Sequence, residues 1–170
     1  MVRFTKKMVK GIISIITSEP CKNRPALQSM RIRRDGYAYI TNGYIVIRYK
    51  FETEVVPVDD KQEEFIIPAS SLVYWYHNAK ATDYLSELSI LDLQSQSDQY
   101  QYPSIEELFA QRLKLLPMPE TRIMKINGLL LEQFCKCAGN SDIKIQQLPD
   151  GIYVESIQEE KVDGIIMGLN

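Results

Sequence analysis

The sequence has few of the residues on which catalysis, metal binding and disulfide formation depend. Among its 170 residues there is one histidine, His77, and there are three cysteines, an odd number that argues against a disulfide framework. A single histidine leaves almost no material for a histidine-based metal site or a catalytic triad. Cys135 and Cys137 would point about 200° apart on a helix, so we interpret them as core residues. The sequence also lacks a glycine-rich phosphate loop. We therefore expect no enzymatic activity, no metal and no cofactor.

Long apolar runs are also missing. Runs such as Gly11–Ile13 are far shorter than the roughly 20 residues that a membrane-spanning helix needs. Polar residues interrupt the first apolar stretch, and no signal-peptide cleavage site follows it. We therefore expect a cytoplasmic protein with no membrane contact. Glycine and proline number 8 each, too few for a disordered or fibrous chain, and the length is sufficient for one hydrophobic core.

Charge is distributed unevenly along the chain. Residues 1–50 contain eleven basic and two acidic side chains, a balance of +9, whereas residues 51–170 have a balance of −11. A local cationic face attracts polyanions even though the whole chain has a net charge of −2. The alternative is an ordinary solvated surface whose two halves neutralise each other, and composition alone favours neither.

The first third of the chain predicts a strand, an amphipathic helix and a meander of strands. Val2–Phe4 is the short strand, and Thr5 is a suitable N-cap for a helix over residues 6–18. The apolar residues of that helix share one face, and the opposite face is purely basic, with Lys6, Lys7 and Lys10. Alternating residues then predict strands up to residue 51, with turns at Asp35-Gly36 and Asn42-Gly43.

The last third repeats this order of elements. We predict a strand over 122–126, a helix over 128–138 capped by Asn127, a hairpin at Asp150-Gly151 and a closing strand over 162–169. Between the two thirds we predict a strand over 65–67, a helix over 72–79, a strand over 88–93 and a short helix after Ser104. The residues expected to pack the two outer helices onto the sheets are Ile12, Ile16, Leu130 and Phe134. We interpret the pattern as one domain with a duplicated βαβββ unit, divided into residues 1–57, an intervening segment 58–119, and residues 120–170.

The consecutive aromatic residues Tyr74, Trp75 and Tyr76 allow two interpretations. They can form a platform on which the bases of single-stranded nucleic acid stack. More commonly, such a run lies on a helix that buries one or two rings in a core, and we favour this second interpretation.

Several segments resemble the bacterial DNA polymerase sliding clamp, and together they span nearly the whole chain. In order, they are Asn23–Leu27 followed by Asp35–Tyr44, Phe65–Leu72, Tyr102–Phe109 and Val162–Leu169. The sequence departs from the family pattern at Asn42, where an aspartate is usual, and at Gly168, which replaces a proline. A clamp subunit has three modules and closes as a dimeric ring, whereas this chain has material for one module. It is similar to a single-module relative of the kind carried by phages or mobile elements.

The resemblance implies an α+β, DNA-clamp-like fold with two βαβββ units, antiparallel sheets and helices on one face. In that family the helices face duplex DNA, which agrees with the basic helix face predicted above. The implied DNA-binding residues are Lys6, Lys7, Lys10 and Arg24. The outward face of the sheet would carry Arg31 and Arg33, away from the DNA.

The resemblance also implies a function and partners. The function is sequence-independent association with duplex DNA, as a replication accessory protein that supports processivity. Replication proteins would be further partners. The resemblance leaves open whether the chain forms a homo-oligomer. In clamps the last strand helps to line a pocket for partner peptides, which implies a weakened pocket at Met167 and Leu169, although an ordinary edge strand is as good an explanation. The alternative function is a protein-interaction module of the same fold that has lost DNA binding and binds or mimics a replication protein.

Overall fold

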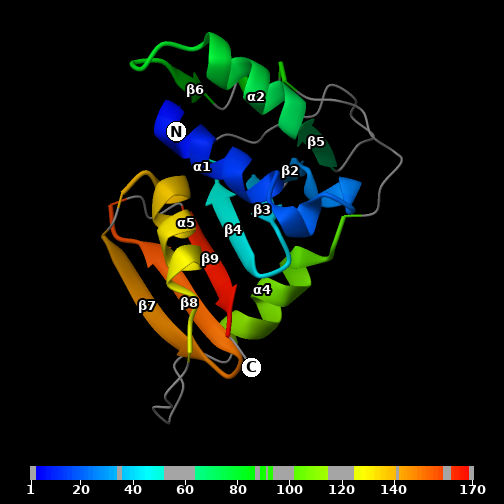
Figure 1. The fold of residues 1–170 in the computed structure, drawn as a ribbon. Helices are drawn as coiled ribbons and strands as arrows, with labels where there is room; N and C mark the ends of the chain where they lie inside the picture. The colour runs from blue at the N-terminus through cyan, green and yellow to red at the C-terminus, as the bar shows by residue number, and fades with distance from the viewer. Residues whose placement is uncertain are drawn as a thin grey trace.

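An antiparallel sheet of seven strands forms the centre of the described fold (Figure 1). The computed structural model describes residues 3–33, 36–51, 64–86, 89–90, 92–93, 102–114, 125–140, 142–158 and 162–168. The strand order is β5-β2-β3-β4-β9-β8-β7. The strands are β2 (Ser29–Arg33), β3 (Tyr37–Thr41), β4 (Ile45–Lys50), β5 (Glu64–Pro68), β7 (Ile143–Leu148), β8 (Gly151–Ser156) and β9 (Val162–Met167). A separate antiparallel pair joins β1 (Arg3–Thr5) to β6 (Tyr84–Ser86).

Three helices form a layer on one side of the large sheet. They are α1 (Lys6–Ile16), α2 (Ala69–Asn78) and α5 (Gly128–Ala138), and α1 lies between the other two (Figure 1). A fourth helix, α4 (Ile105–Leu113), packs against the opposite face. Two short 3-10 helices, η1 (Glu19–Cys21) and η2 (Pro25–Leu27), connect α1 to β2. The predicted α+β fold is confirmed: the sheets are antiparallel, and α1 and α5, the helices predicted in the first and last thirds of the chain, lie on one face.

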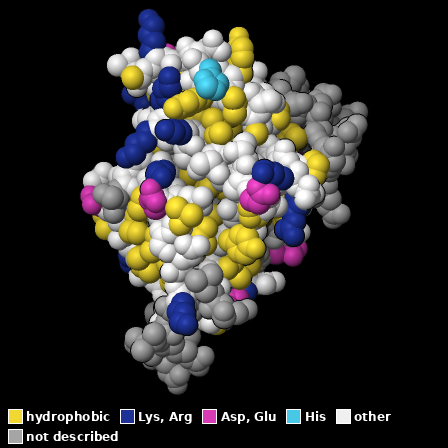
Figure 2. All heavy atoms as spheres, in the orientation of Figure 1, with side chains coloured by type: hydrophobic (Ala, Val, Ile, Leu, Met, Phe, Trp, Pro, Cys, Tyr) yellow, Lys and Arg dark blue, Asp and Glu magenta, His cyan; other side chains and the backbone are white. Residues whose placement is uncertain are grey.

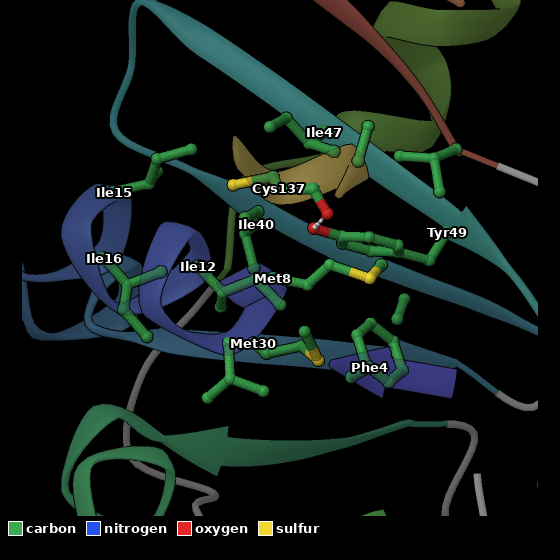
Figure 3. Close-up of a cluster of buried hydrophobic side chains, with 14 of the residues drawn as sticks. Phe4, Met8, Ile12, Ile15, Ile16, Met30, Ile40, Ile47, Tyr49 and Cys137 are labelled. Atoms are coloured by element: carbon green, nitrogen blue, oxygen red, sulfur yellow. Dashed lines mark hydrogen bonds between the residues drawn. The ribbon is translucent and has the colours of Figure 1, made fainter. Parts of the chain in front are cut away.

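The main core lies between the helix layer and the sheet. Figure 3 shows Met8, Ile12 and Ile16 of α1 beside Met30 of β2 and Ile40 of β3. The four residues predicted to pack the outer helices onto the sheet are all buried: Ile12, Ile16, Leu130 and Phe134. In the same core the Tyr49 hydroxyl donates a hydrogen bond to the backbone oxygen of Cys137, 3.4 Å away, and so ties β4 to α5 (Figure 3).

A second, smaller core lies under α4, and the sequence did not predict it. Ile105 and Phe109 of α4 are buried against the outer face of the sheet. Its buried residues are Tyr39, Val46, Tyr102, Ile105, Phe109, Leu148 and Ile165. Strands β3, β4 and β9 are therefore covered on both faces, which explains why most of their residues are buried.

The predicted helix ends are confirmed at three caps. The Thr5 hydroxyl accepts a hydrogen bond from the backbone N–H of Met8 (3.3 Å), and the Asn127 side chain accepts one from Leu129 (3.0 Å). Gly139 ends α5 in the left-handed conformation, with φ of +79°. Helix α1 ends at Ile16, two residues before its predicted end at residue 18.

One of the predicted hairpin turns is correct and another is shifted by a residue. At Asn42-Gly43, Gly43 has a φ of +92°, and the Asn42 side chain accepts hydrogen bonds from the backbone amides of Tyr44 (3.0 Å) and Ile45 (3.1 Å). The hairpin predicted at Asp150-Gly151 is present and joins β7 to β8, but its two-residue loop is Pro149-Asp150, because Leu148 pairs with Gly151. Gly151 serves a different purpose: a Cβ there would lie 2.3 Å from the backbone oxygen of Ile166 on β9.

Two predicted strands are not found in the residues that can be described. Ser89 and Ile90 of the predicted strand 88–93 are helical, because the Ser86 hydroxyl accepts a hydrogen bond from Ser89 N–H and begins a helical turn. The strand of this region is β6, whose Leu85 is buried. Of the predicted strand 122–126, Lys125 and Ile126 are irregular, and the remainder lies outside the described residues.

The turn residue Asp35 and parts of both outer units also lie outside the described residues, as does much of the intervening segment. In the described part of the chain, no helix is long and apolar enough to cross a membrane.

Candidate nucleic-acid interface

The three lysines of α1 occupy different environments. Lys7 and Lys10 are exposed, because Met8, Val9 and Ile12 turn the other side of the helix into the core. Lys6 is half-buried: its ammonium donates a hydrogen bond to the Ala79 oxygen (2.6 Å) and lies 4.9 Å from the centre of the Tyr76 ring. The structure therefore binds Lys6 to the end of α2 and leaves Lys7 and Lys10 on the outer surface of the helix layer.

The helix layer as a whole is cationic. Helices α1, α2 and α5 contain four lysines and one glutamate, and that residue, Glu132, pairs with Lys136 at 2.6 Å. Figure 2 shows basic side chains, in dark blue, gathered over the end of this layer where α2 and the start of α1 lie. In contrast, α4 on the other face carries Glu106 and Glu107 against a single arginine. The electrostatic potential that attracts an anionic ligand is therefore on the side of the helix layer.

Part of the positive charge in the first fifty residues is paired with acidic residues and partly covered. Arg31 and Arg33 lie on the outer face as predicted, but both pair with Glu106 of α4, at 2.9 and 3.1 Å. Arg31 also pairs with Glu64. These arginines are partly covered rather than solvated, so they orient α4 on the sheet. The positive charge of the first fifty residues is thus divided between an exposed basic helix and partly covered arginines that pair with acidic residues from the rest of the chain.

Arg24 lies apart from the start of α1. Its backbone N–H bonds to the oxygen of Cys21, whose thiol donates to Ile15 in the last turn of α1. The Arg24 side chain is exposed and reaches the β3–β4 turn, where its guanidinium would be 3.6 Å from a Cβ on Gly43. The structure therefore separates Arg24 from Lys6 and Lys7 by the length of the helix, roughly 15 Å for eleven residues.

Arg24 stands instead at the rim of an apolar pocket of about 230 Å³. Helix α4 forms one wall, and the β3–β4 turn, η2, β4 and the end of β9 form the others. The lining residues are Arg24, Leu27, Thr41, Gly43, Val46, Pro103, Ser104, Ile105, Leu108 and Met167. Most of the pocket surface is apolar, and the Arg24 guanidinium lies at its edge. Such a pocket suits a ligand that presents an apolar side chain next to a carboxylate.

Met167, at the end of β9, lines the pocket as predicted, whereas Leu169 lies outside the described residues. The backbone beyond β9 is fixed: Met167 N–H bonds to the oxygen of Tyr44 (2.9 Å) and Gly168 N–H to the oxygen of Asp150 (2.8 Å). Gly168, which replaces the proline of the family pattern, is thus itself held by a backbone hydrogen bond. The sequence reasoning missed Leu27, Val46, Ile105 and Leu108 as pocket residues. A signal existed, because four of the five segments that resemble a clamp meet at this pocket.

The cysteines and the aromatic run have mainly structural roles. Cys137 is buried and Cys135 half-buried, and burial raises the pKa of both thiols, that of Cys137 to about 12. The residues that can be described hold no cluster of three or more His, Cys, Asp and Glu side chains fit for a metal ion. Trp75 and Tyr76 pack against the main core, but Tyr74 is 71 % exposed.

Comparison with known proteins gives a structural likeness alone. Neither a protein-family model nor a curated protein matches the sequence. The Helicobacter pylori beta clamp, solved with 3,4-difluorobenzamide, is similar with a TM-score of 0.61 and 10 % identity, over 97 % of this chain and 63 % of the clamp. A DnaN sliding clamp, the DNA polymerase III subunit beta, from Bartonella birtlesii bound to griselimycin is similar with a TM-score of 0.55 and 12 % identity, over 97 % of this chain and 64 % of that clamp. The C. crescentus beta sliding clamp is similar with a TM-score of 0.55 and 10 % identity, over 100 % of this chain and 65 % of that clamp.

The match thus spans less than two thirds of each clamp while covering nearly all of this chain. Identities near 10 % concern the fold and not the surface chemistry. This protein has the fold of a bacterial DNA polymerase sliding clamp.

Proposed function

We propose that the protein associates with duplex DNA through the outward side of α1, as a non-enzymatic, clamp-like accessory protein of DNA replication. The observation that carries the proposal is the charge of α1, which has three lysines in its first five residues and no acidic side chain. The neighbouring α2 has no acidic side chain either. Likeness to the polymerase clamps supports the proposal at the level of the fold.

The proposed contacts are with phosphates, so binding does not depend on base sequence. Lysine presents a point charge with three donors and reads no base edge in the way that a bidentate arginine does. Lys6 uses one donor on Ala79 and keeps the others for a phosphate. Three phosphate contacts give a slope of log affinity against log salt of about −3. This is a weak interaction, which suits sliding contact.

The test is binding to a long labelled duplex over a series of salt concentrations. The triple variant Lys6→Glu, Lys7→Glu and Lys10→Glu should abolish binding, and fluorescence anisotropy measures this. The matched control reverses Lys50 and Lys114, which are exposed on β4 and after α4. The control should bind as the parent does. If the parent shows no salt-dependent binding, or if the triple variant binds as the parent does, the proposal fails.

The apolar pocket favours a second function, docking of a partner's peptide. We propose that it accepts an apolar side chain of an extended segment of a replication protein, with Arg24 pairing to a nearby carboxylate. Leu108 is half-buried at the wall and faces the pocket from α4. If duplex binding is absent and peptide binding is present, the protein is an interaction module of clamp fold.

Leu108→Ala tests the pocket, with a labelled peptide of the kind that binds bacterial sliding clamps as the probe. Removing most of the Leu108 side chain from this apolar contact should lower the affinity for the peptide roughly tenfold. Lys114→Ala, just after α4 and not among the pocket's lining residues, is the control. Equal peptide affinity for the parent and Leu108→Ala would dispose of the pocket as a docking site.

A further inference from the structure

Helix α5 places an ion pair on the outward surface of the helix layer. Beyond its first residue, the exposed positions of this helix are Leu129, Glu132 and Lys136, which lie on one side of it. The Lys136 ammonium lies 2.6 Å from a carboxylate oxygen of Glu132, and their side chains are 48 % and 56 % exposed. We name these two residues the α5 pair. A ligand that approaches the helix layer from outside can therefore reach both charges.

The α5 pair lies beside the lysines of α1. Helices α5 and α1 pack against each other (Figure 1), and a Cβ on Gly11 would lie 2.9 Å from the carbonyl carbon of Lys136. Lys10 immediately precedes Gly11 in α1. Lys7 is four residues before Gly11 and so shares its side of the helix, the side that meets α5. Lys136 therefore stands across the helix crossing from the two exposed lysines to which the duplex function is assigned.

The electrostatics of Cys135 agree with this arrangement. Burial is the main influence on the pKa of this half-buried thiol and raises it, while the charge of Lys7 lowers that pKa and the charge of Glu132 raises it. Exposed charges act on one another over roughly 10 Å in about 0.1 M salt. Lys7 of α1 and Glu132 of α5 therefore belong to one neighbourhood, and a duplex on α1 would meet both.

Glu132 opposes a polyanion in two ways. It is the one acidic residue of α1, α2 and α5, three helices that the structure describes throughout, so its charge is the local source of repulsion. It also occupies the ammonium of Lys136. If Lys136 turned to a phosphate, the Glu132 carboxylate would be left unpaired beside the DNA and would retain a cation. The α5 pair as a whole then releases no counterion and adds nothing to affinity.

We propose that Lys136 is a further phosphate-binding lysine of the duplex surface and that Glu132 neutralises it, which keeps the contact with DNA weak. The inference rests on the proposed duplex function and extends its surface from α1 onto α5. It assigns a role to each member of the α5 pair: Lys136 binds phosphate only when Glu132 loses its charge, and Glu132 limits the number of effective contacts to those of α1.

The test is duplex binding by Glu132→Gln over a series of salt concentrations, followed by fluorescence anisotropy. This variant keeps the shape of the side chain and frees Lys136 for one more phosphate. The slope of log affinity against log salt should steepen by about 0.9, and affinity should rise roughly fivefold to tenfold at about 0.1 M salt. The matched control is Glu107→Gln, which removes the same charge from an exposed position of α4 on the opposite face. It should bind as the parent does.

The double variant Glu132→Gln with Lys136→Gln separates release of Lys136 from simple repulsion by Glu132. It carries neither charge of the α5 pair, so its affinity and salt slope should return to those of the parent. If it instead keeps the whole gain of Glu132→Gln, Glu132 acts by repulsion alone and the assignment of Lys136 is overturned. Urea unfolding should be the same for all these variants, because both side chains are exposed.

Failure of the inference and failure of the duplex function give different results. A parent that binds duplex with salt dependence, together with a Glu132→Gln variant of equal affinity, overturns the inference and leaves the duplex function standing. An equal gain from Glu107→Gln also overturns it, because the effect would then follow the net charge of the chain. If the parent and Glu132→Gln both fail to bind duplex, the duplex function and the inference fall together.

Discussion

The crossing of α1 and α5 depends on Gly11, and Gly11→Ala tests the packing of the helix layer. A Cβ at this position would lie 2.9 Å from both the Cys137 nitrogen and the Lys136 carbonyl carbon of α5. Both atoms are backbone, so no rotamer change relieves the contact and one helix must move. Overpacking of this kind costs about 1–3 kcal/mol. Alanine is a better helix former than glycine by about 1 kcal/mol, which offsets part of that cost.

Because the clash involves backbone, we take the upper end of the overpacking range and subtract the gain in helix propensity, so Gly11→Ala should lower the free energy of unfolding by about 2 kcal/mol. This corresponds to a fall in Tm of roughly 4–8 °C for a chain of this size. Gly128→Ala is the matched control, since a Cβ on Gly128 has no atom within 4 Å and this residue also lies on a helix. It should leave stability unchanged or raise it slightly. Urea unfolding measures both variants. If Gly11→Ala is as stable as the parent, the close approach of the helices is wrong.

Three further predictions concern the core, a buried thiol and the sheet edge. Ile12→Ala and Phe134→Ala should each cost about 2–5 kcal/mol in urea unfolding, and a cost near zero at both would contradict the helix packing. Burial keeps the Cys137 thiol protonated up to a pKa of about 12, whereas the unfolded thiol ionises near 9.0, so the native state holds more protons and stability should fall as pH rises above about 9. Chemical unfolding at pH 8 to 10.5 measures this, and a flat profile would refute it. β7 is an edge strand with Ile145 50 % exposed, so any homo-oligomer should pair there. Ile145→Lys should then shift sedimentation toward the monomer; unchanged association would exclude this edge.

The elements of the fold were predictable where local chemistry decides them. The helical periodicity of residues 6–18 correctly placed Lys7 and Lys10 on the face opposite Ile12 and Ile16, because an amphipathic helix packed on a core has only one stable orientation. Asn42-Gly43 was predictable as a turn, since these residues supply the side-chain acceptors and the positive φ that the turn requires. Asp150-Gly151 carries the same two-residue signature and also marks a hairpin, but the loop is shifted by one residue, because Gly151 is required by the approach of β9, a long-range contact.

The candidate sites were predictable only in part, because they depend on elements far apart in the chain. Charge alone did not distinguish Arg31, which pairs with Glu106 of α4, from Lys10, which is exposed. Arg24 was grouped with the lysines of α1 through the resemblance, and the sequence did not show that it also lies at the rim of a pocket beside the β3–β4 turn and α4. No periodicity in residues 105–113 tells which face of the sheet α4 covers. The pocket forms because α4 covers the outer face of the sheet, opposite the helix layer.

The place of β9 in the sheet constrains the order in which the chain can fold. β9 pairs with β4 on one side and with β8 on the other, and its Asp163 meets Arg48 across 115 residues of sequence. Pairing over such a separation carries a large loop-closure entropy, so we expect the full sheet to form slowly, in about milliseconds to seconds. While the protein is being synthesised, β4 must wait as an open edge until residues 162–167 have left the ribosome. A nascent chain is therefore most prone to intermolecular strand pairing just before its last strand arrives, and a pause in translation at that point would favour aggregation over folding.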